Sequence, residues 1–215
     1  MDKNNLIDEI DILKAIFYHE SRLKQFYEEE IEKNPIAKEY KLTYQPYWTN
    51  NAGVGIGQLD PCPFEAQWNW KKHISDSVEI FYIEKRKSIH NIYGAMNKYL
   101  IRSRNIAIDK ATKNRQSANI TSQPNIDDLI TISENDNLYA LTDYQKKRII
   151  IRAWNGGYEY RIDYEYVVDE NNDVKLIGSG EWLNKPFFQV NNGSIIELSR
   201  NYDYVDLVLN EFQPY

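Results

Sequence analysis

The sequence has few cysteines and no long apolar run at its start, which are features of disulfide-bonded and membrane-spanning proteins. A single cysteine, Cys62, excludes an internal disulfide and leaves the redox compartment open. Acidic residues interrupt the apolar positions of residues 1–17, so this segment resembles neither a signal peptide nor a membrane-spanning helix. We therefore expect no membrane span and synthesis in the cytoplasm, with any action in the periplasm or on a cell wall needing non-Sec export, phage delivery or lysis.

The sequence also has no cluster of basic residues. Its net charge is −6, its pI is near 5.2 and its cations are scattered, so nucleic acid is not an expected partner. No histidine or second carboxylate cluster accompanies the acidic run at residues 28–32, which predicts a solvated helix face without a metal. No cofactor is expected. We interpret Cys62 as a small buried residue and not as a nucleophile, because no histidine lies near it in sequence.

What is present indicates a folded globular chain. Hydrophobic residues make up 42% of the 215 residues and aromatic residues 13%. This length favours one domain.

The first helix has an apolar stripe that ends on a carboxylate. Leu6, Ile10, Leu13 and Phe17 recur at helical spacing, and Glu20 is the next position of the stripe. Local conflicts of this kind concentrate at functional sites. Burial and the negative end of the helix dipole both favour the protonated form of a carboxyl group, which suits a general acid. The alternative is an exposed glutamate at a frayed helix end.

The remaining sequence predicts further helices and one hairpin. Residues 64–104 have helical periodicity with a break near Ser88, and residues 105–140 have the composition of a long polar excursion. Thr142 and Gln145 form a capping box for a helix that ends at residues 156–157. Strict alternation over residues 158–168, followed by VKLIG, predicts a hairpin, and residues 202–212 predict a terminal helix. The fold class is therefore α+β and predominantly α-helical.

A glycine-rich stretch, NNAGVGIGQLDP at residues 50–61, requires its own explanation. A phosphate-binding loop must follow a buried strand and open a helix, and neither flank qualifies. A turn that uses glycine for positive φ explains one or two of the glycines, but not the Gln58 and Asp60 that follow.

Three separated motifs occur in a fixed order: Glu20-Ser21, Gly55-Ile56-Gly57-Gln58-Leu59 and Ala153-Trp154-Asn155-Gly156. Together they resemble the lysozyme-like superfamily, in particular soluble lytic transglycosylases and goose-type lysozymes. Those families have a helix ending in Glu-Ser, a Gly-Leu-Met-Gln-hydrophobic loop, and a late helix ending in Ala-Tyr-Asn-x-Gly. Gly57 stands where they usually have Met, and Trp154 where the transglycosylases usually have Tyr. The resemblance implies one lysozyme-like domain with a core at about 5–157, a β-hairpin insertion at about 158–200 and a terminal helix at about 202–212.

The resemblance also implies a catalytic site. Glu20 matches the position of the superfamily's catalytic acid, and Asp60 falls where goose-type lysozymes have an aspartate that helps to activate water. Asp60 could equally be an N-cap or turn residue before the next helix. Aromatic rings and amides suit a sugar cleft, and Ser21 is expected to form a hydrogen bond within its own helix end and not to act as a nucleophile. The residues expected to bind substrate are Gln58, Tyr18, Ser21, Trp48, Gly55, Trp154 and Asn155, although core packing is the preferred interpretation of Trp154.

Two functions follow as hypotheses. The first is cleavage of the β-1,4 bond between N-acetylmuramic acid and N-acetylglucosamine in peptidoglycan, by hydrolysis or by transglycosylation, as an antibacterial effector or phage-type lysin. An effector of this kind needs a cognate inhibitor, or immunity protein, in the producing cell. The second is a non-catalytic glycan-binding or structural component of a phage tail or secretion machine.

Overall fold

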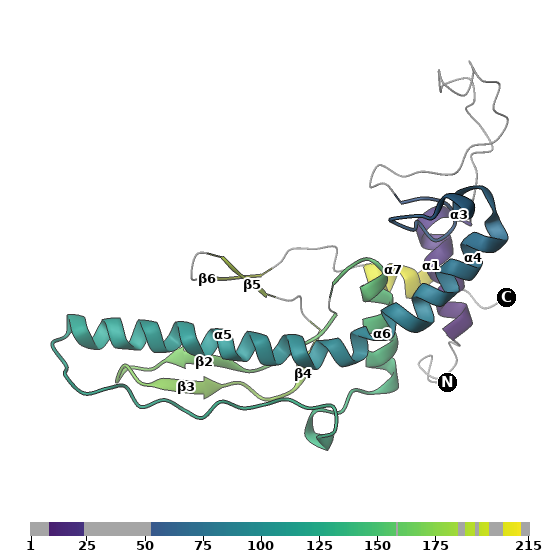
Figure 1. Ribbon diagram of the computed structural model, residues 1–215. Coiled ribbons are helices and arrows are strands. Elements are labelled where there is room, and N and C mark those ends of the chain that lie inside the picture. Colours follow the sequence, from purple (N-terminus) through teal and green to yellow (C-terminus); the bar gives the residue numbers. More distant parts are fainter. Residues whose placement is uncertain are drawn as a thin grey trace, which may run out of the picture. The chain divides into compact units, whose positions relative to one another are not determined.

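The computed structural model describes residues 9–23, 53–157, 159–184, 188–191, 194–197 and 204–211. Its elements are helices and short two-stranded antiparallel sheets, with helix predominant, which confirms the predicted α+β class (Figure 1). The chain divides into two compact units, residues 1–86 with 203–215 and residues 87–202. Compactness alone does not make a unit an independent domain, so the one-domain arrangement stays a prediction.

In the first unit, helix α1 (Glu9–Ser21) packs against the terminal helix α7 (Tyr204–Glu211). Leu13 and Phe17 are buried as predicted, but Ile10 is 54% exposed, and Leu6 lies outside the described residues. The buried face is instead centred on Ile12 and Ile16. Since α1 has apolar residues around more than half of its circumference, the stripe alone does not decide which face is buried.

The same unit contains α3 (Phe64–Trp68), α4 (Trp70–Glu79) and a π-helical segment, η2 (Ile80–Lys85). The predicted break near Ser88 is confirmed, but the stretch before it is not continuous. Asn69 has an extended backbone, and its side chain accepts hydrogen bonds from the amides of Lys71 and Lys72. Asparagine at an N-cap satisfies free amide groups in this way and so starts a new helix.

The second unit is built on α5 (Ser88–Ser117), which packs along the hairpin of β2 (Glu165–Val168) and β3 (Val174–Ile177) (Figure 1). The prediction that helix ends before residue 105 is wrong. Ala107, Ala111 and Arg115 recur at four-residue spacing and are all buried, so this polar stretch still has one face for packing. The segment between residues 118 and 142 contains a short 3-10 helix, η3 (Asn137–Tyr139).

Helix α6 (Asp143–Trp154) begins with the predicted capping box of Thr142 and Gln145. The predicted single strand after it is wrong: β1 (Arg161–Ile162) pairs with β4 (Trp182–Leu183), and β2 belongs to another sheet. The break lies at Asp163, whose carboxylate accepts hydrogen bonds from the amide and hydroxyl of Ser179. A third pair is formed by β5 (Phe188–Asn191) and β6 (Ser194–Glu197).

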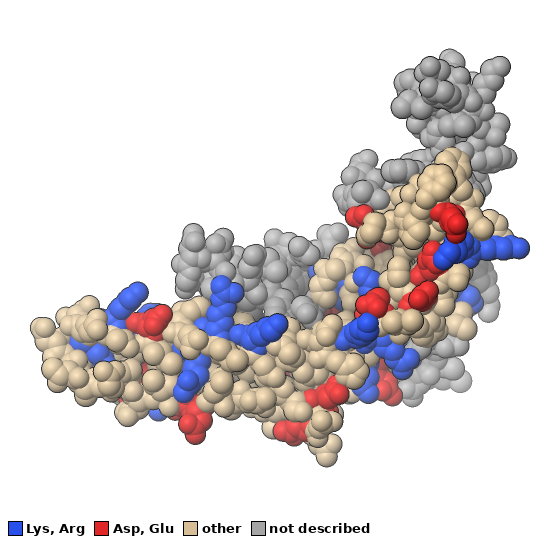
Figure 2. All heavy atoms as spheres, viewed as in Figure 1, with Lys and Arg blue, Asp and Glu red and all other residues tan. Residues whose placement is uncertain are grey.

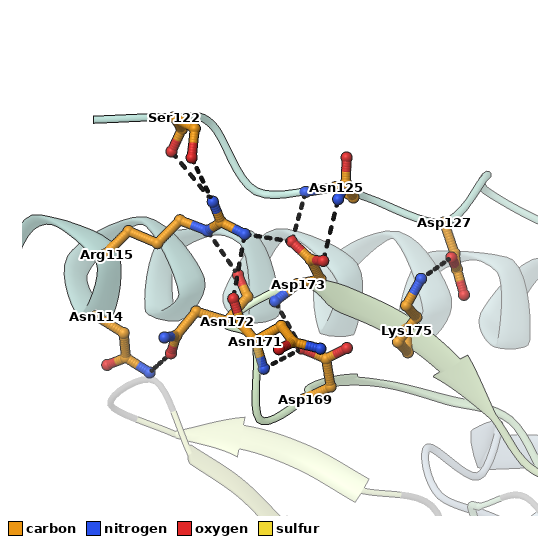
Figure 3. Close-up of polar contacts among 10 residues, drawn as sticks. All are labelled: Asn114, Arg115, Ser122, Asn125, Asp127, Asp169, Asn171, Asn172, Asp173 and Lys175. Carbon is orange, nitrogen blue, oxygen red and sulfur yellow. Dashed lines mark hydrogen bonds and ion pairs between the residues drawn. The ribbon is translucent and has the colours of Figure 1, made fainter. Parts of the chain in front are cut away.

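A polar cluster fastens the β2–β3 turn to α5 (Figure 3). Asp173 pairs with Arg115 and accepts hydrogen bonds from the backbone and side-chain nitrogens of Asn125, at 2.8 and 3.1 Å. Arg115 also donates to the carbonyl groups of Asn171 and Asn172. The Asn125 hydrogen bonds, with a smaller contribution from Arg115, lower the pKa of Asp173.

Charges of both signs are interspersed on the face of the molecule drawn in Figure 2. None of the described helices is long and apolar enough to cross a membrane.

Candidate active site

The glycine-rich stretch forms a tight turn. Val54 and Leu59 exchange both backbone hydrogen bonds, at 3.2 and 3.1 Å, and residues 55–58 connect them. Gly55 and Gln58 have positive φ angles of 70° and 50°. The chain then passes through exposed Asp60, which has a cis bond to Pro61, before α3 begins. Because Pro63 is the N-cap of α3, Asp60 does not have the N-cap role that we had considered for it.

The end of α1 contacts this turn through Ser21. The Ser21 hydroxyl is hydrogen-bonded to the Phe17 carbonyl oxygen at 3.0 Å, as predicted for a residue at its own helix end. The same hydroxyl oxygen lies 2.8 Å from the Ile56 carbonyl oxygen, and Ser21 is only 2% exposed. This contact places the Glu-Ser helix end beside the Gly-Ile-Gly-Gln turn.

Glu20 is half-buried, and its partner comes from the far end of the chain. The Tyr204 hydroxyl donates a hydrogen bond of 2.5 Å to Glu20 Oε1, and the Tyr204 ring makes an edge contact with the ring of His19. The sequence indicated a helix around Tyr204 but gave no sign that this side chain reaches Glu20.

The opposite side of the turn rests on α4. The Gly57 amide donates a hydrogen bond of 3.0 Å to Nε2 of His73, which is fully buried. A Cβ atom on Gly57 would lie 2.5 Å from Ser77 Oγ and 3.1 Å from Phe17 Cε1. Glycine is therefore required here by close packing, and a methionine would not fit without rearrangement.

Gln58 folds back onto its own turn. Its side-chain nitrogen donates to the Gly55 carbonyl at 2.7 Å, and its Oε1 is buried without a hydrogen-bond partner among the described residues. The packing of Gly53 is also close, because a Cβ atom there would lie 2.8 Å from Gln58 Oε1. In this conformation the amide nitrogen stabilises the turn.

Cys62 has a histidine neighbour that its sequence context did not indicate. Its Sγ lies 3.8 Å from Nδ1 of His73, and the cysteine is half-buried. Because Nε2 of His73 accepts from Gly57, the neutral ring has its proton on Nδ1 and cannot remove the thiol proton there. Burial and, to a smaller extent, Asp76 raise the pKa of the Cys62 thiol, which is opposite to what a nucleophile requires.

The other predicted site residues belong to different parts of the chain. In the first unit, Tyr18 is 43% exposed, with the Arg22 guanidinium 4.6 Å from its ring centroid. Trp48 lies outside the described residues. In the second unit, Trp154 is half-buried and Asn155 is exposed at the end of α6. The structure thus brings together Glu20-Ser21 and the turn that contains Gly55 and Gln58, and it adds Tyr204, His73 and Ser77.

Apolar periodicity does not single out His73 and Ser77, because the buried residues of α4 are all polar: His73, Asp76 and Ser77. In the described part of the chain, no group of three histidine, cysteine or acidic residues is placed to hold a metal ion. The chain matches no protein-family model, no curated protein and no solved structure. The function therefore has to be argued from the site's own residues.

Proposed function

We propose that the protein is a glycosidase that cleaves the β-1,4 bond between N-acetylmuramic acid and N-acetylglucosamine in peptidoglycan, with a lysozyme-like catalytic scaffold. One observation carries this proposal: the close contact between the Ser21 hydroxyl and the Ile56 carbonyl. It joins two motifs that are 35 residues apart in sequence and that the resemblance requires to share one site. The proposal would have lost its basis had the helix end and the turn been separated.

Glu20 has the role of general acid and base in this proposal. Glycoside cleavage needs a proton delivered to the departing oxygen, and the half-buried carboxyl group of Glu20 at the end of α1 has the chemistry to deliver it. Its Oε1 is held by Tyr204, and Ser21 anchors the helix end. A carboxyl group with a fixed orientation loses little freedom when the substrate binds.

Asp60 is the proposed second carboxylate of a hydrolytic mechanism. It is exposed and follows directly after the turn, where water has access. Inverting hydrolysis requires two carboxylates about 6.5–9.5 Å apart, with the attacking water between the sugar and the base. In a transglycosylase Glu20 alone would act first as acid and then as base, and the substrate's own hydroxyl would close an anhydro ring. We propose that Tyr18 and Trp48 contribute to sugar binding.

The test compares wild type with Glu20→Gln in a turbidity assay on purified cell walls. Glutamine keeps the shape of the side chain but cannot donate the proton, so clearing should fall by about a hundredfold or more. Glu79→Gln, an exposed change on α4 of the same unit, is the matched control and should clear walls at the wild-type rate.

Equal clearing by wild type and Glu20→Gln would refute the role of Glu20. Wall binding by wild type without any clearing would refute the enzyme and favour a non-catalytic glycan-binding component. Asp60→Asn separates the two subtypes: hydrolysis should slow strongly in this variant, whereas transglycosylation should persist.

A further inference from the structure

The glycine turn is held from two sides by different elements of the first unit. On one side, Ser21 of α1 lies in hydrogen-bond contact with the Ile56 carbonyl. On the other side, His73 of α4 accepts the hydrogen bond of the next amide, that of Gly57. The first contact involves a hydroxyl that does not titrate near neutral pH. The second involves an imidazole, whose ordinary pKa lies close to physiological pH.

The hydrogen bond from Gly57 defines the protonation state of His73. Nε2 can accept an N–H only when it has a free lone pair, so the ring is neutral and its proton is on Nδ1. The ring is fully buried and makes a further hydrogen bond to the backbone of Ala66. A protonated ring would have two donors and would present one of them to the Gly57 amide, which is itself a donor.

We propose that His73 is a positioning residue: its neutral ring holds the amide of Gly57 and fixes the turn beside Glu20, and protonation of the ring releases that hold. Ser77 supports the arrangement, because its side chain fills the space next to Gly57 and leaves no room for a Cβ there.

The surroundings of the ring favour its neutral form. Desolvation is the largest effect and lowers the pKa of His73 from 6.5, while the Ala66 hydrogen bond and the charge of Asp76 oppose it. From the turn the ring faces the Gly57 amide, from the segment before α3 it faces the Cys62 thiol, and on its own helix it is near Asp76, which is paired with Lys72. Because the pKa of His73 is lowered, the neutral ring contributes its full stability to the folded state above pH 6.5. This contribution is lost as the pH falls through the pKa that His73 has in the folded state.

The effect on glycan cleavage rests on the proposed function, whereas the hydrogen bond and its titration do not. They can be measured by NMR on the full chain labelled with 15N-glycine and carbonyl-13C-isoleucine. Gly57 and Gly178 are the two glycines that follow an isoleucine, so this labelling gives two carbonyl-coupled amide signals. Gly178 lies in the second unit and provides an internal control.

In wild type the Gly57 amide proton should move upfield on acidification, with its midpoint below pH 6.5, and Gly178 should not share that transition. His73→Gln keeps an acceptor at the place of Nε2 and does not titrate, so its Gly57 signal should stay downfield without the transition. His73→Asn is too short to reach Gly57, so its signal should lie upfield throughout. A Gly57 signal in wild type that does not titrate, or the same midpoint in His73→Gln, would overturn the proposal.

A second measurement covers the case in which a variant at this buried position does not fold. The chain has three histidines, so a 15N spectrum of the imidazole rings of wild type resolves the tautomer of each. The proposal requires an unprotonated Nε2 and a protonated Nδ1 for the buried ring near neutral pH, and the opposite tautomer would overturn it.

Wall clearing by wild type should also fall on acidification relative to clearing by His73→Gln. If Gly57 titrates as expected and neither protein clears walls, the proposed function fails and the positioning role of His73 stands.

Discussion

Replacing Gly57 by alanine should destabilise the first unit, because the new methyl group has no space. It would lie 2.5 Å from Ser77 Oγ and 3.1 Å from Phe17 Cε1, and the first distance is far below ordinary contact. Forcing an extra carbon into a closely packed site costs about 1–3 kcal/mol. We expect this loss in the free energy of unfolding, measured by urea denaturation followed by far-UV circular dichroism.

A double-mutant cycle with Ser77→Ala isolates the cause. Ser77 Oγ is buried and has no hydrogen-bond partner among the described residues, so its removal alone should be neutral or stabilising by up to about 1 kcal/mol. In the double variant the shortest contact of the new methyl group, that with Ser77 Oγ, disappears. Its contacts with Ser77 Cβ at 3.3 Å and with Phe17 Cε1 at 3.1 Å stay close. The double variant should therefore recover part of the loss, with a coupling energy of about 1–2 kcal/mol.

Gly94→Ala is the matched control. Gly94 is an exposed interior position of α5, and a Cβ atom there would meet nothing within 4 Å. Alanine should stabilise this helix by about 0.5–1 kcal/mol. The packing argument is refuted if Gly57→Ala behaves like Gly94→Ala, or if the effects of Gly57→Ala and Ser77→Ala are simply additive.

Two further predictions concern the hydrogen bonds of each unit. Tyr204→Phe removes the donor to Glu20 and should lower the free energy of unfolding by about 1–2 kcal/mol, measured by urea denaturation, because the acceptor is a half-buried carboxylate. Asp173→Asn should destabilise the protein at neutral pH, and urea titrations across pH should show the difference from wild type shrinking as the pH falls below 3.8, because the folded-state pKa of Asp173 is lowered.

Each of these has a result that contradicts it. Unchanged stability in Tyr204→Phe would mean that α7 is held to α1 by its apolar residues alone. A penalty for Asp173→Asn that does not vary with pH would show that the carboxylate's charge is not what the Asn125 and Arg115 contacts stabilise.

Local signals in the sequence predicted local structure well. The capping box at Thr142 and the hairpin around residues 165–177 appear where expected, because each depends on residues within a few positions. The contact between Ser21 and the turn was not visible in periodicity. It was implied only by the order of the motifs, since a hydrogen bond across 35 residues leaves no pattern in the sequence between them.

The errors have physical causes of two kinds. In α1 apolar residues cover more than half of the circumference, so the stripe alone does not show that Ile10 is exposed while Ile12 and Ile16 are buried. In α5 the buried face beyond residue 105 consists of two alanines and the stem of Arg115, which give little hydrophobic signal. Glu159 is a charged position of the alternating stretch at residues 158–168, yet it is buried in an ion pair with Arg148 of α6. Such pairing depends on tertiary contacts and cannot be found from alternation alone.

The central claim is that Glu20 delivers the proton that breaks a glycosidic bond, and its most direct test is mass spectrometry of the products from purified peptidoglycan. Wild type should release disaccharide-containing fragments with either anhydro or water-added reducing ends, and Glu20→Gln should release none. The absence of such fragments with wild type, or the same fragments in equal amount with Glu20→Gln, would contradict the claim.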